Sequence, residues 1–431
     1  IRTNNIVIML FGSSGIRQLY SHELLRLGPL VGAAVSVGSR KVILGTDTRT
    51  SGPVLASAVL SGLLSGGAEV SFGGIAPTPA VAIAAGNADA GIMITASHNP
   101  ECYNGYKLFR RDGSSFTLAE QEEIEELIAH PQYAEWDRQG SVVQTDLNTP
   151  HINGIHDEIG SFDKKMTVVA DCGNGAGCMV TPFALEALDA DVIKVNCTPN
   201  GVFSRPSEPL KENLLHVPEI IAKNHADCAV VNDGDADRMM AFDNKGRYID
   251  GDAMLALFAD YLGAKTVVTT VDASMAIEDT GAHVIRTPVG DSFVSEKLIE
   301  GGEFGGEPSG AWVFPKHSLC PDGPYAAALL VKMASELNLA EAVDALPKYT
   351  ILRDSIKSEY AKEIVKSLGA ENPTDGIRLA AEDGWYLIRA SGTEPKVRCT
   401  AEGKTKEIAK EMLRTGMDKI QKAERDIKCS A

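Results

Sequence analysis

The 431-residue chain has few basic residues for its size, no long apolar run and no paired-cysteine motif. Its 41 Lys and Arg residues against 58 Asp and Glu residues give a net charge of −17. This excess of negative charge argues against nucleic acid or an anionic membrane as a partner. No apolar run approaches the roughly 20 residues that a membrane span requires. An anionic substrate must therefore be attracted by a local basic cluster, because the overall field repels it.

The eight cysteines contain no Cys-x-x-Cys pair. This distribution favours reduced thiols and a cytoplasmic location over a disulfide framework or a zinc site. The apolar run at residues 6–11 is short, lacks a cleavage-like tail and continues into Gly-Ser-Ser-Gly. It therefore predicts a first strand and not a signal peptide. Met9 is a candidate native start, in which case residues 1–8 are an extension; Ile1 is the alternative.

Length and composition predict several domains. An apolar strand, a small-residue turn and a helix follow one another three times, beginning at residues 41, 168 and 267. Such units build mainly parallel α/β layers, so three copies suggest three related domains, although these units recur in any large α/β protein. The polar segment 137–150 is interpreted as the first boundary. After Pro347 the pattern changes to short strands around 349–357, 377–381 and 385–390, with helices near 360–368 and 405–425. The predicted fold class is α/β: three related α/β domains with mixed, mainly parallel sheets and a smaller C-terminal α+β domain, at residues 1–148, 149–248, 249–348 and 349–431.

Residues 95–100 read Thr-Ala-Ser-His-Asn-Pro and follow a predicted strand at 91–95. Ligands of α/β sheets bind at such strand ends. A serine hydroxyl is a poor nucleophile, but a phosphoserine is a phosphoryl carrier that a divalent metal can hold. Ser97 is therefore a candidate carrier. The alternative is a turn with a helix-capping serine, whereas a Ser-His-Asp hydrolase is disfavoured because a Gly-x-Ser-x-Gly elbow is missing.

Three carboxylates stand on alternate residues directly after the apolar run 228–232: Asp233, Asp235 and Asp237. A calcium-binding EF-hand is excluded, because its sixth position is Arg238 instead of glycine and its twelfth is Asn244 instead of glutamate. The cluster suits Mg²⁺ held partly by protein and partly by a phosphate oxygen. A surface acidic loop is the alternative, but three like charges this close repel one another without a cation.

Residues 305–310 place a carboxylate, Glu307, and a hydroxyl, Ser309, on a loop bracketed by glycines. Such a preformed pair can exchange hydrogen bonds with neighbouring sugar hydroxyls. Taken alone, the segment is a turn.

Residues 389–398 carry cations and hydroxyls between two predicted strands. Guanidinium groups, hydroxyls and exposed backbone N–H groups together can clamp a phosphate. A basic surface turn is the alternative, but this density of cations in an acidic chain favours anion binding. The candidate residues are Arg389, Ser391, Gly392, Thr393, Lys396 and Arg398.

These four segments, in this order, resemble the α-D-phosphohexomutase family, whose members interconvert sugar 1-phosphates and 6-phosphates. The opening Phe11-Gly-Ser-Ser-Gly-Ile-Arg17 is similar to the family's N-terminal motif, so the resemblance covers essentially the whole chain. It implies four domains around a central cleft, one Mg²⁺ ion per chain, and a bisphosphorylated hexose as activator and intermediate. Ser97 would be the phosphoserine, and its phosphate would bind Mg²⁺ together with Asp233, Asp235 and Asp237.

The resemblance also implies roles for the other motif residues. Glu307 and Ser309 would read the sugar hydroxyls. The non-reacting phosphate would be held by Arg389, Ser391, Gly392, Thr393 and Arg398. The phosphoserine would be lined by Arg17, His98, Lys107 and Arg238, among which Lys107 and His98 are candidates for proton transfer.

Two departures from the family pattern bear on the sugar. Ala311 stands where many members have a histidine, so a basic group is missing or is replaced, with His317 as a candidate. Asp291 stands where members acting on glucose and mannose phosphates often have histidine. An aspartate at this position is similar to members acting on glucosamine phosphates. A carboxylate there would suit an ammonium at C2. We therefore expect a cytoplasmic monomer or homodimer that interconverts glucosamine 6-phosphate and glucosamine 1-phosphate for amino-sugar nucleotide synthesis. One alternative is a mutase of the same fold that acts on glucose or mannose phosphates. The other is a non-catalytic sugar-phosphate sensor.

Overall fold

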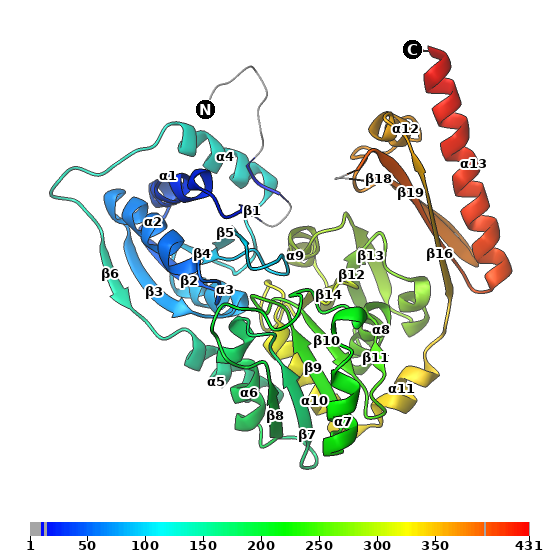
Figure 1. The fold of residues 1–431 in the computed structure, drawn as a ribbon, viewed down its shortest axis with the longest axis horizontal. Coiled ribbons are helices and arrows are strands. Elements are labelled where there is room, and N and C mark those ends of the chain that lie inside the picture. The colour runs from blue at the N-terminus through cyan, green and yellow to red at the C-terminus, as the bar shows by residue number, and fades with distance from the viewer. Residues whose placement is uncertain (1–9, 13–14, 392–393, 431) are drawn as a thin grey trace.

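A computed structural model of the chain describes residues 10–12, 15–391 and 394–430 (Figure 1). In this part of the chain, four sheets follow one another along the sequence. Three are mixed sheets with helices, and the C-terminal sheet is entirely antiparallel. The predicted fold class is therefore confirmed. Every helix in the described ranges is too short or too polar to span a bilayer.

The first sheet has the strand order β1-β5-β4-β2-β3-β6. Its inner strands β2 and β4 are buried on both faces and read as continuous apolar runs. Helix α4 begins with a capping box, in which Thr117 and Glu120 satisfy each other's backbone N–H groups. The elements are β1 (Ile16–Leu19), α1 (His22–Gly38), β2 (Lys41–Thr46), α2 (Gly52–Ser65), β3 (Glu69–Ile75), α3 (Thr78–Ala84), a 3₁₀ turn (Ala85–Asn87), β4 (Ala90–Ile94), β5 (Tyr103–Arg110), α4 (Leu118–Ala129) and β6 (Ser141–Gln144).

The second sheet has the order β11-β10-β9-β7-β8. Strands β7, β8 and β9 are parallel, whereas β10 returns antiparallel to β9. The aspartate loop therefore lies at the carboxyl end of β9. The elements are α5 (Asn148–Ile159), β7 (Thr167–Asp171), a 3₁₀ turn (Ala176–Met179), α6 (Thr181–Ala187), β8 (Asp191–Val195), a 3₁₀ turn (Lys211–Asn213), α7 (Val217–Asn224), β9 (Cys228–Asn232), β10 (Met239–Phe242) and β11 (Tyr248–Ile249).

The third sheet has the order β13-β12-β14-β15. It shares one hydrophobic core with the second sheet, and this core contains Val168, Val230, Phe258 and Trp312. The two units are thus packed as one body. The elements are α8 (Gly251–Tyr261), β12 (Thr266–Thr270), a 3₁₀ helix (Met275–Thr280), β13 (His283–Thr287), α9 (Asp291–Glu300), β14 (Phe304–Gly306), β15 (Trp312–Val313), α10 (Gly323–Glu336) and α11 (Leu339–Ala345).

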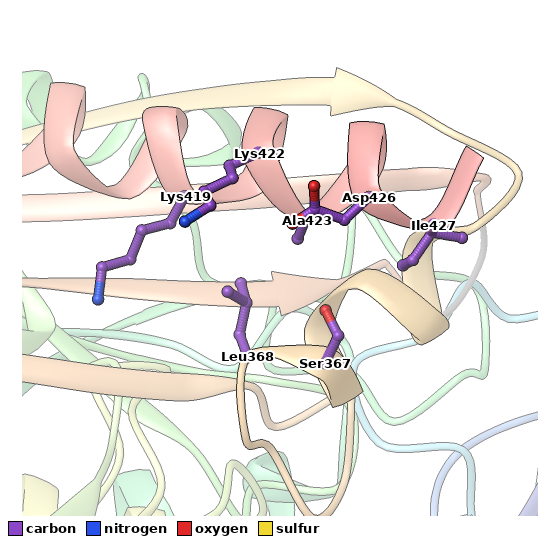
Figure 2. Close-up of a pocket in the computed structure, with 7 residues that line it drawn as sticks. All are labelled: Ser367, Leu368, Lys419, Lys422, Ala423, Asp426 and Ile427. Carbon is purple, nitrogen blue, oxygen red and sulfur yellow. The ribbon is translucent and has the colours of Figure 1, made fainter. Parts of the chain in front are cut away.

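The C-terminal sheet has the order β16-β19-β18-β17 and its own core. Long helix α13 packs against β16, β18 and β19 (Figure 1). A groove of about 640 Å³ lies between the end of α12 and α13, lined by Leu368, Lys419, Ala423 and Ile427 among others (Figure 2). None of the predicted site residues lines it. The elements are β16 (Thr350–Lys357), α12 (Ala361–Ser367), β17 (Ile377–Ala381), β18 (Gly384–Ala390), β19 (Lys396–Gly403) and α13 (Lys406–Ser430).

The C-terminal unit attaches to the third unit through the loop that follows β12. Buried Glu402 accepts hydrogen bonds from Ser274 Oγ (2.5 Å) and from the backbone N–H of Met275 (2.7 Å). Arg378 donates to the backbone carbonyls of residues 271 and 273, and its guanidinium stacks on Trp385. These contacts between the two units are polar, and joints of this kind commonly permit relative movement of the units.

Candidate active site

The backbone of Ser97 is held in an unusual conformation just after β4. Its φ of 48° lies in the left-handed region, which residues other than glycine rarely adopt. Thr95 Oγ1 accepts a hydrogen bond from the Ser97 N–H (2.8 Å), and the buried guanidinium of Arg49 donates to the carbonyls of Ser97 (2.8 Å) and Asn99 (2.7 Å). Such strain persists only where surrounding structure fixes it, and it is concentrated at functional sites.

The sequence interpretation missed Arg49, the residue that fixes this loop. Arg49 also pairs with Asp47 Oδ2 at 2.9 Å, and both side chains are fully buried. The signal was present, since Asp47 and Arg49 lie in the turn of the first strand-turn-helix unit, between β2 and α2, but that unit was interpreted only as an element of the fold.

The structure brings Ser97 against the aspartate loop, 136 residues further along the chain. Ser97 Oγ donates to Asp233 Oδ2 at 2.9 Å and lies 3.3 Å from Asp237 Oδ1. Ser97 is only 1% exposed. The hydroxyl from the first sheet and the carboxylates from the second therefore form one buried site.

The three aspartates crowd their negative charges into this site. Donor oxygens from Asp233, Asp235 and Asp237 all lie within 4.8 Å of one another, and all three residues are buried. Burial, reinforced by the neighbouring carboxylates, raises the pKa of Asp233 and of Asp237. Burial alone would also raise the pKa of Asp235, but attraction and hydrogen bonding by Lys107, together with a hydrogen bond from Thr78, lower it.

Lys107 compensates only part of this charge. Its Nζ donates to Asp235 Oδ2 (2.8 Å) and Asp237 Oδ2 (2.5 Å). Burial opposes the charged ammonium, yet these two carboxylates raise the pKa of Lys107 above its ordinary value. Asp235 Oδ1 is buried without a hydrogen-bond partner among the described residues. Three hard oxygens, one of them unsatisfied, and a surplus of negative charge fit a Mg²⁺ ion.

Other basic side chains surround the serine. His98 Nδ1 lies 3.4 Å from Ser97 Oγ. Burial, followed by the charges of Arg238 and Arg17, lowers the pKa of His98 to about 2, so the ring is neutral at physiological pH. Arg238 lies 3.5 Å from Glu208 and donates its backbone N–H towards Asp233 Oδ1 at 3.3 Å. His98 thus faces the serine, Arg17 and Arg238 lie near enough for their charges to act on His98, and Lys107 contacts the aspartates.

The third unit contributes Glu307 and Asp291. Glu307 Oε1 accepts a hydrogen bond from the backbone N–H of Gly290 (2.9 Å), and Ser309 Oγ lies 3.4 Å from Glu307 Oε2. Burial, together with the charge of Asp291, raises the pKa of Glu307 to about 7. Asp291 begins α9 and is close enough to Asp237 to raise that pKa as well. The sugar-reading candidates therefore border the serine and aspartate site.

The fourth segment stands apart from these three. Arg389 on β18 and Arg398 on β19 are cross-strand partners, and Arg398 donates to Ser391 Oγ at 3.3 Å. Arg389 lies 3.9 Å from Asp272 of the third unit. Gly392 and Thr393 lie outside the described residues. In Figure 1 the β18–β19 pair and the end of β4 lie on different sides of α9.

His317 contacts carboxylates outside the loop that carries Glu307 and Ser309. Its two ring nitrogens lie 2.9 Å from Glu158 and 3.1 Å from Asp322. Ala311, at the departure from the family pattern, is buried and forms a backbone bridge with Arg238.

This fold and this site define a multi-domain α/β enzyme of the phosphohexomutase class. Phosphohexomutases are isomerases. Family models named phosphoglucomutase/phosphomannomutase match the chain in four stretches: α/β/α domain I at residues 9–135, domain II at 151–246, domain III at 250–349 and the C-terminal domain at 341–415. The chain belongs to the phosphoglucomutase/phosphomannomutase family.

Relatives extend this match over nearly the full length. A "Probable phosphoglucosamine mutase" of Methanosarcina barkeri is 41% identical, covering 94% of this chain and 100% of the relative. One of the same name from Pyrococcus abyssi is 40% identical, covering 96% and 98%. A solved phosphoglucomutase/phosphomannomutase family protein of Burkholderia thailandensis, 24% identical, covers 97% of this chain and 98% of its own with a TM-score of 0.83. Aspergillus fumigatus N-acetylphosphoglucosamine mutase in complex with GlcNAc-6P and magnesium is 15% identical, covers 96% of each chain and has a TM-score of 0.58.

Proposed function

We propose that the protein interconverts glucosamine 6-phosphate and glucosamine 1-phosphate, through a phosphoserine at position 97 and a bisphosphorylated sugar intermediate. The observation that carries this proposal is the buried Ser97 hydroxyl, 2.9 Å from the first of three clustered carboxylates. A serine that only formed a turn would not need its hydroxyl buried among three carboxylates. It suits a phosphoryl carrier whose charge a metal ion offsets.

The carboxylates would hold the metal against the phosphoserine. Asp233, Asp235 and Asp237, with an oxygen of the Ser97 phosphate, would be the ligands of Mg²⁺. When bound, the ion would neutralise negative charge on the phosphoryl group during transfer. The solved structure of the Aspergillus protein is a complex with GlcNAc-6P and magnesium, and the same metal is proposed here. At 15% identity this protein supports the likeness of fold alone.

The pKa directions favour different roles for the two proton-transfer candidates. Two paired carboxylates raise the pKa of Lys107, so its ammonium is protonated and would give up a proton only to a strong base, such as the serine oxygen as it leaves phosphorus. Burial, with the charges of Arg238 and Arg17, lowers the pKa of His98 to about 2, so the neutral ring alone is a weak base. It would accept the proton of the attacking sugar hydroxyl once the negative charge of the phosphoryl group beside it raises that pKa. Arg17 and Arg238 would stabilise the phosphoryl oxygens.

Glu307 and Ser309 would orient the sugar through its hydroxyls. Asp291 would select glucosamine, because a carboxylate forms a stronger, charge-assisted hydrogen bond with the ammonium at C2 than with the neutral C2 hydroxyl of glucose or mannose. Support comes from the position of Asp291, whose charge reaches both Glu307 and Asp237. The names of the archaeal relatives agree with this choice of sugar.

The residues Arg389, Ser391, Gly392, Thr393 and Arg398 would grip the phosphate that is not reacting. In the intermediate, the two phosphates would exchange places by half a turn of the sugar, and the second would return to Ser97. The clamp must approach the serine to close on a sugar and relax for the turn. The polar joint at Glu402 would permit this movement.

The test compares glucosamine, glucose and mannose phosphates on one preparation of enzyme and of Asp291→His. The wild type should turn over glucosamine phosphate with the highest kcat/KM, and the variant should lose this preference. Highest kcat/KM on glucose or mannose phosphate would overturn the choice of sugar and favour the phosphoglucomutase/phosphomannomutase alternative. Release of free phosphate as fast as isomerisation, or no turnover of any sugar phosphate, would overturn the mutase proposal itself.

A further inference from the structure

A second cluster of potential metal ligands lies outside the proposed active site. It consists of His151 on α5, His317 in the loop after β15, and Asp322 at the start of α10, whose donor atoms lie within 4.8 Å of one another. The three side chains are only 1%, 4% and 1% exposed. They come from two segments: His151 lies 171 residues before Asp322, whereas His317 lies only 5 residues before it.

Both histidines point at the same carboxylate oxygen. Asp322 Oδ2 lies 2.7 Å from His151 Nε2 and 3.1 Å from His317 Nε2. The other oxygen, Oδ1, is already used, because it accepts the N–H of Tyr325 and caps α10. Oδ2 is thus left for the two rings, and the three atoms form a compact N–O–N arrangement.

Without a metal, both rings must share this one carboxylate oxygen. His317 Nδ1 lies 2.9 Å from Glu158, so each of its nitrogens faces a carboxylate oxygen and must carry a hydrogen. His151 Nδ1 is buried without a hydrogen-bond partner among the described residues, so the contact of this ring with Asp322 is made by Nε2. Two ring nitrogens and one carboxylate oxygen therefore face one another at a single buried point.

We propose that His151 Nε2, His317 Nε2 and Asp322 Oδ2 bind a transition-metal ion of the Zn²⁺ kind. On binding, one proton leaves His317 Nε2 for solvent, and His151 moves its hydrogen from Nε2 to Nδ1. The divalent charge then balances Asp322 and Glu158. Imidazole nitrogens suit zinc, whereas the all-carboxylate cluster at Ser97 suits magnesium, so the two sites differ in ligand softness.

Glu158 supports this assignment as an outer partner of the metal. Histidine ligands of metals commonly donate their other ring N–H to a carboxylate, which fixes the ring and its tautomer. His317 makes such a contact with Glu158 at 2.9 Å. Glu158 is 39% exposed, so it also marks the side from which an ion and a fourth ligand, a water molecule, can enter.

The site would stiffen the support of the aspartate loop. Gly323, next to Asp322, donates its N–H to the carbonyl of Ala236 (3.1 Å). A Cβ on Gly323 would lie 2.7 Å from that oxygen and 2.6 Å from the carbonyl oxygen of Arg238, so the contact leaves no spare room. A metal that fixes Asp322 would therefore hold the N-terminus of α10 firmly beneath the aspartate loop.

The experiment uses metal-stripped full-length protein titrated with Co²⁺ in excess Mg²⁺, which occupies the carboxylate cluster. The wild type should bind one Co²⁺, with the intense visible absorption of a four-coordinate site. His151→Phe and His317→Gln should each lose this absorption and at least tenfold in affinity. Asp235→Asn, altered in the other cluster, and His156→Ala, an exposed histidine on the same helix, should keep it.

A second measurement does not depend on whether the variants fold. X-ray absorption of the Zn²⁺-loaded wild type should show imidazole nitrogens at about 2.0–2.1 Å from the metal. Absence of imidazole scattering, or Co²⁺ absorption lost in Asp235→Asn but kept in the histidine variants, would overturn the assignment. In that case, the cluster is a hydrogen-bonded staple between α5 and α10.

Discussion

Replacing Glu307 by glutamine should stabilise the protein at pH 8 while removing a group that the proposed reaction needs. Glu307 is 6% exposed, and burial with the charge of Asp291 raises its pKa from 4.5 to about 7. At pH 8 the folded protein therefore holds a poorly solvated carboxylate. Glutamine keeps the oxygen that accepts a hydrogen bond from the backbone N–H of Gly290. Because glutamine carries no charge, the free-energy cost of burying a carboxylate disappears.

The size and sign of the effect follow from the two pKa values. An unfolded chain loses the Glu307 proton near pH 4.5, whereas the folded protein keeps it to about pH 7. Unfolding in this window releases a proton, so the free energy of unfolding falls as pH rises and the loss is complete above pH 7. The two pKa values differ by about 2.5, and each pKa unit corresponds to about 1.4 kcal/mol, so the free energy of unfolding falls by about 3 kcal/mol.

Urea unfolding followed by tryptophan fluorescence tests this value, because buried Trp312 pairs with Gly306 next to Glu307. Glu307→Gln and wild type should be equally stable near pH 4.5 and differ by about 3 kcal/mol at pH 8, in favour of the variant. Glu303→Gln is the matched control, since the pKa of Glu303 is lowered by a backbone hydrogen bond from Lys265, and it should give no gain. A Glu307→Gln variant that is less stable than wild type at pH 8 would refute the reasoning.

Three further outcomes are expected. Lys107→Met should lower kcat at least a hundredfold and destabilise the apo protein by about 3–5 kcal/mol in urea unfolding, because two buried carboxylates lose their cation; unchanged stability would contradict the ion-pair geometry. Chelation with EDTA should abolish isomerisation, and added Mg²⁺ should restore it, whereas full activity in EDTA would exclude the aspartate cluster as a required metal site. Glu402→Ala should raise KM for sugar phosphate several-fold and speed proteolysis near residues 346–349, because the polar joint of the C-terminal unit is lost. A protease-resistant variant with wild-type KM would argue against movement at this joint.

Short-range patterns were enough to predict the elements that follow local rules. In the C-terminal unit, strands predicted at 349–357 and 377–381 are observed as Thr350–Lys357 and Ile377–Ala381. The polar stretch 137–150 was interpreted as a boundary, yet Ser141–Gln144 forms an exposed edge strand of the first sheet. Its two valines suit a strand, but they are exposed and the residues around them are polar, so the pairing with β3 is what reveals the strand.

The site was predictable where residues follow strand ends and unpredictable where the partner lies far along the chain. Ser97 and Asp233 each follow a strand, and resemblance to the family placed them in one site. Nothing local indicates that Lys107 would neutralise Asp235, because that contact spans 128 residues and depends on β5 lying beside β4. The buried role of Arg49 depends in the same way on tertiary contacts.

Intact-mass spectrometry after exposure to a bisphosphorylated hexose, with mutase assays on the same samples, most directly tests phosphoryl transfer through Ser97. Wild type and the exposed-serine control Ser57→Ala should gain the mass of one phosphoryl group and isomerise sugar phosphate at equal rates. Ser97→Ala should gain no mass and lose nearly all activity. Normal isomerisation by Ser97→Ala, or phosphorylation of that variant to the same extent, would contradict the covalent mechanism.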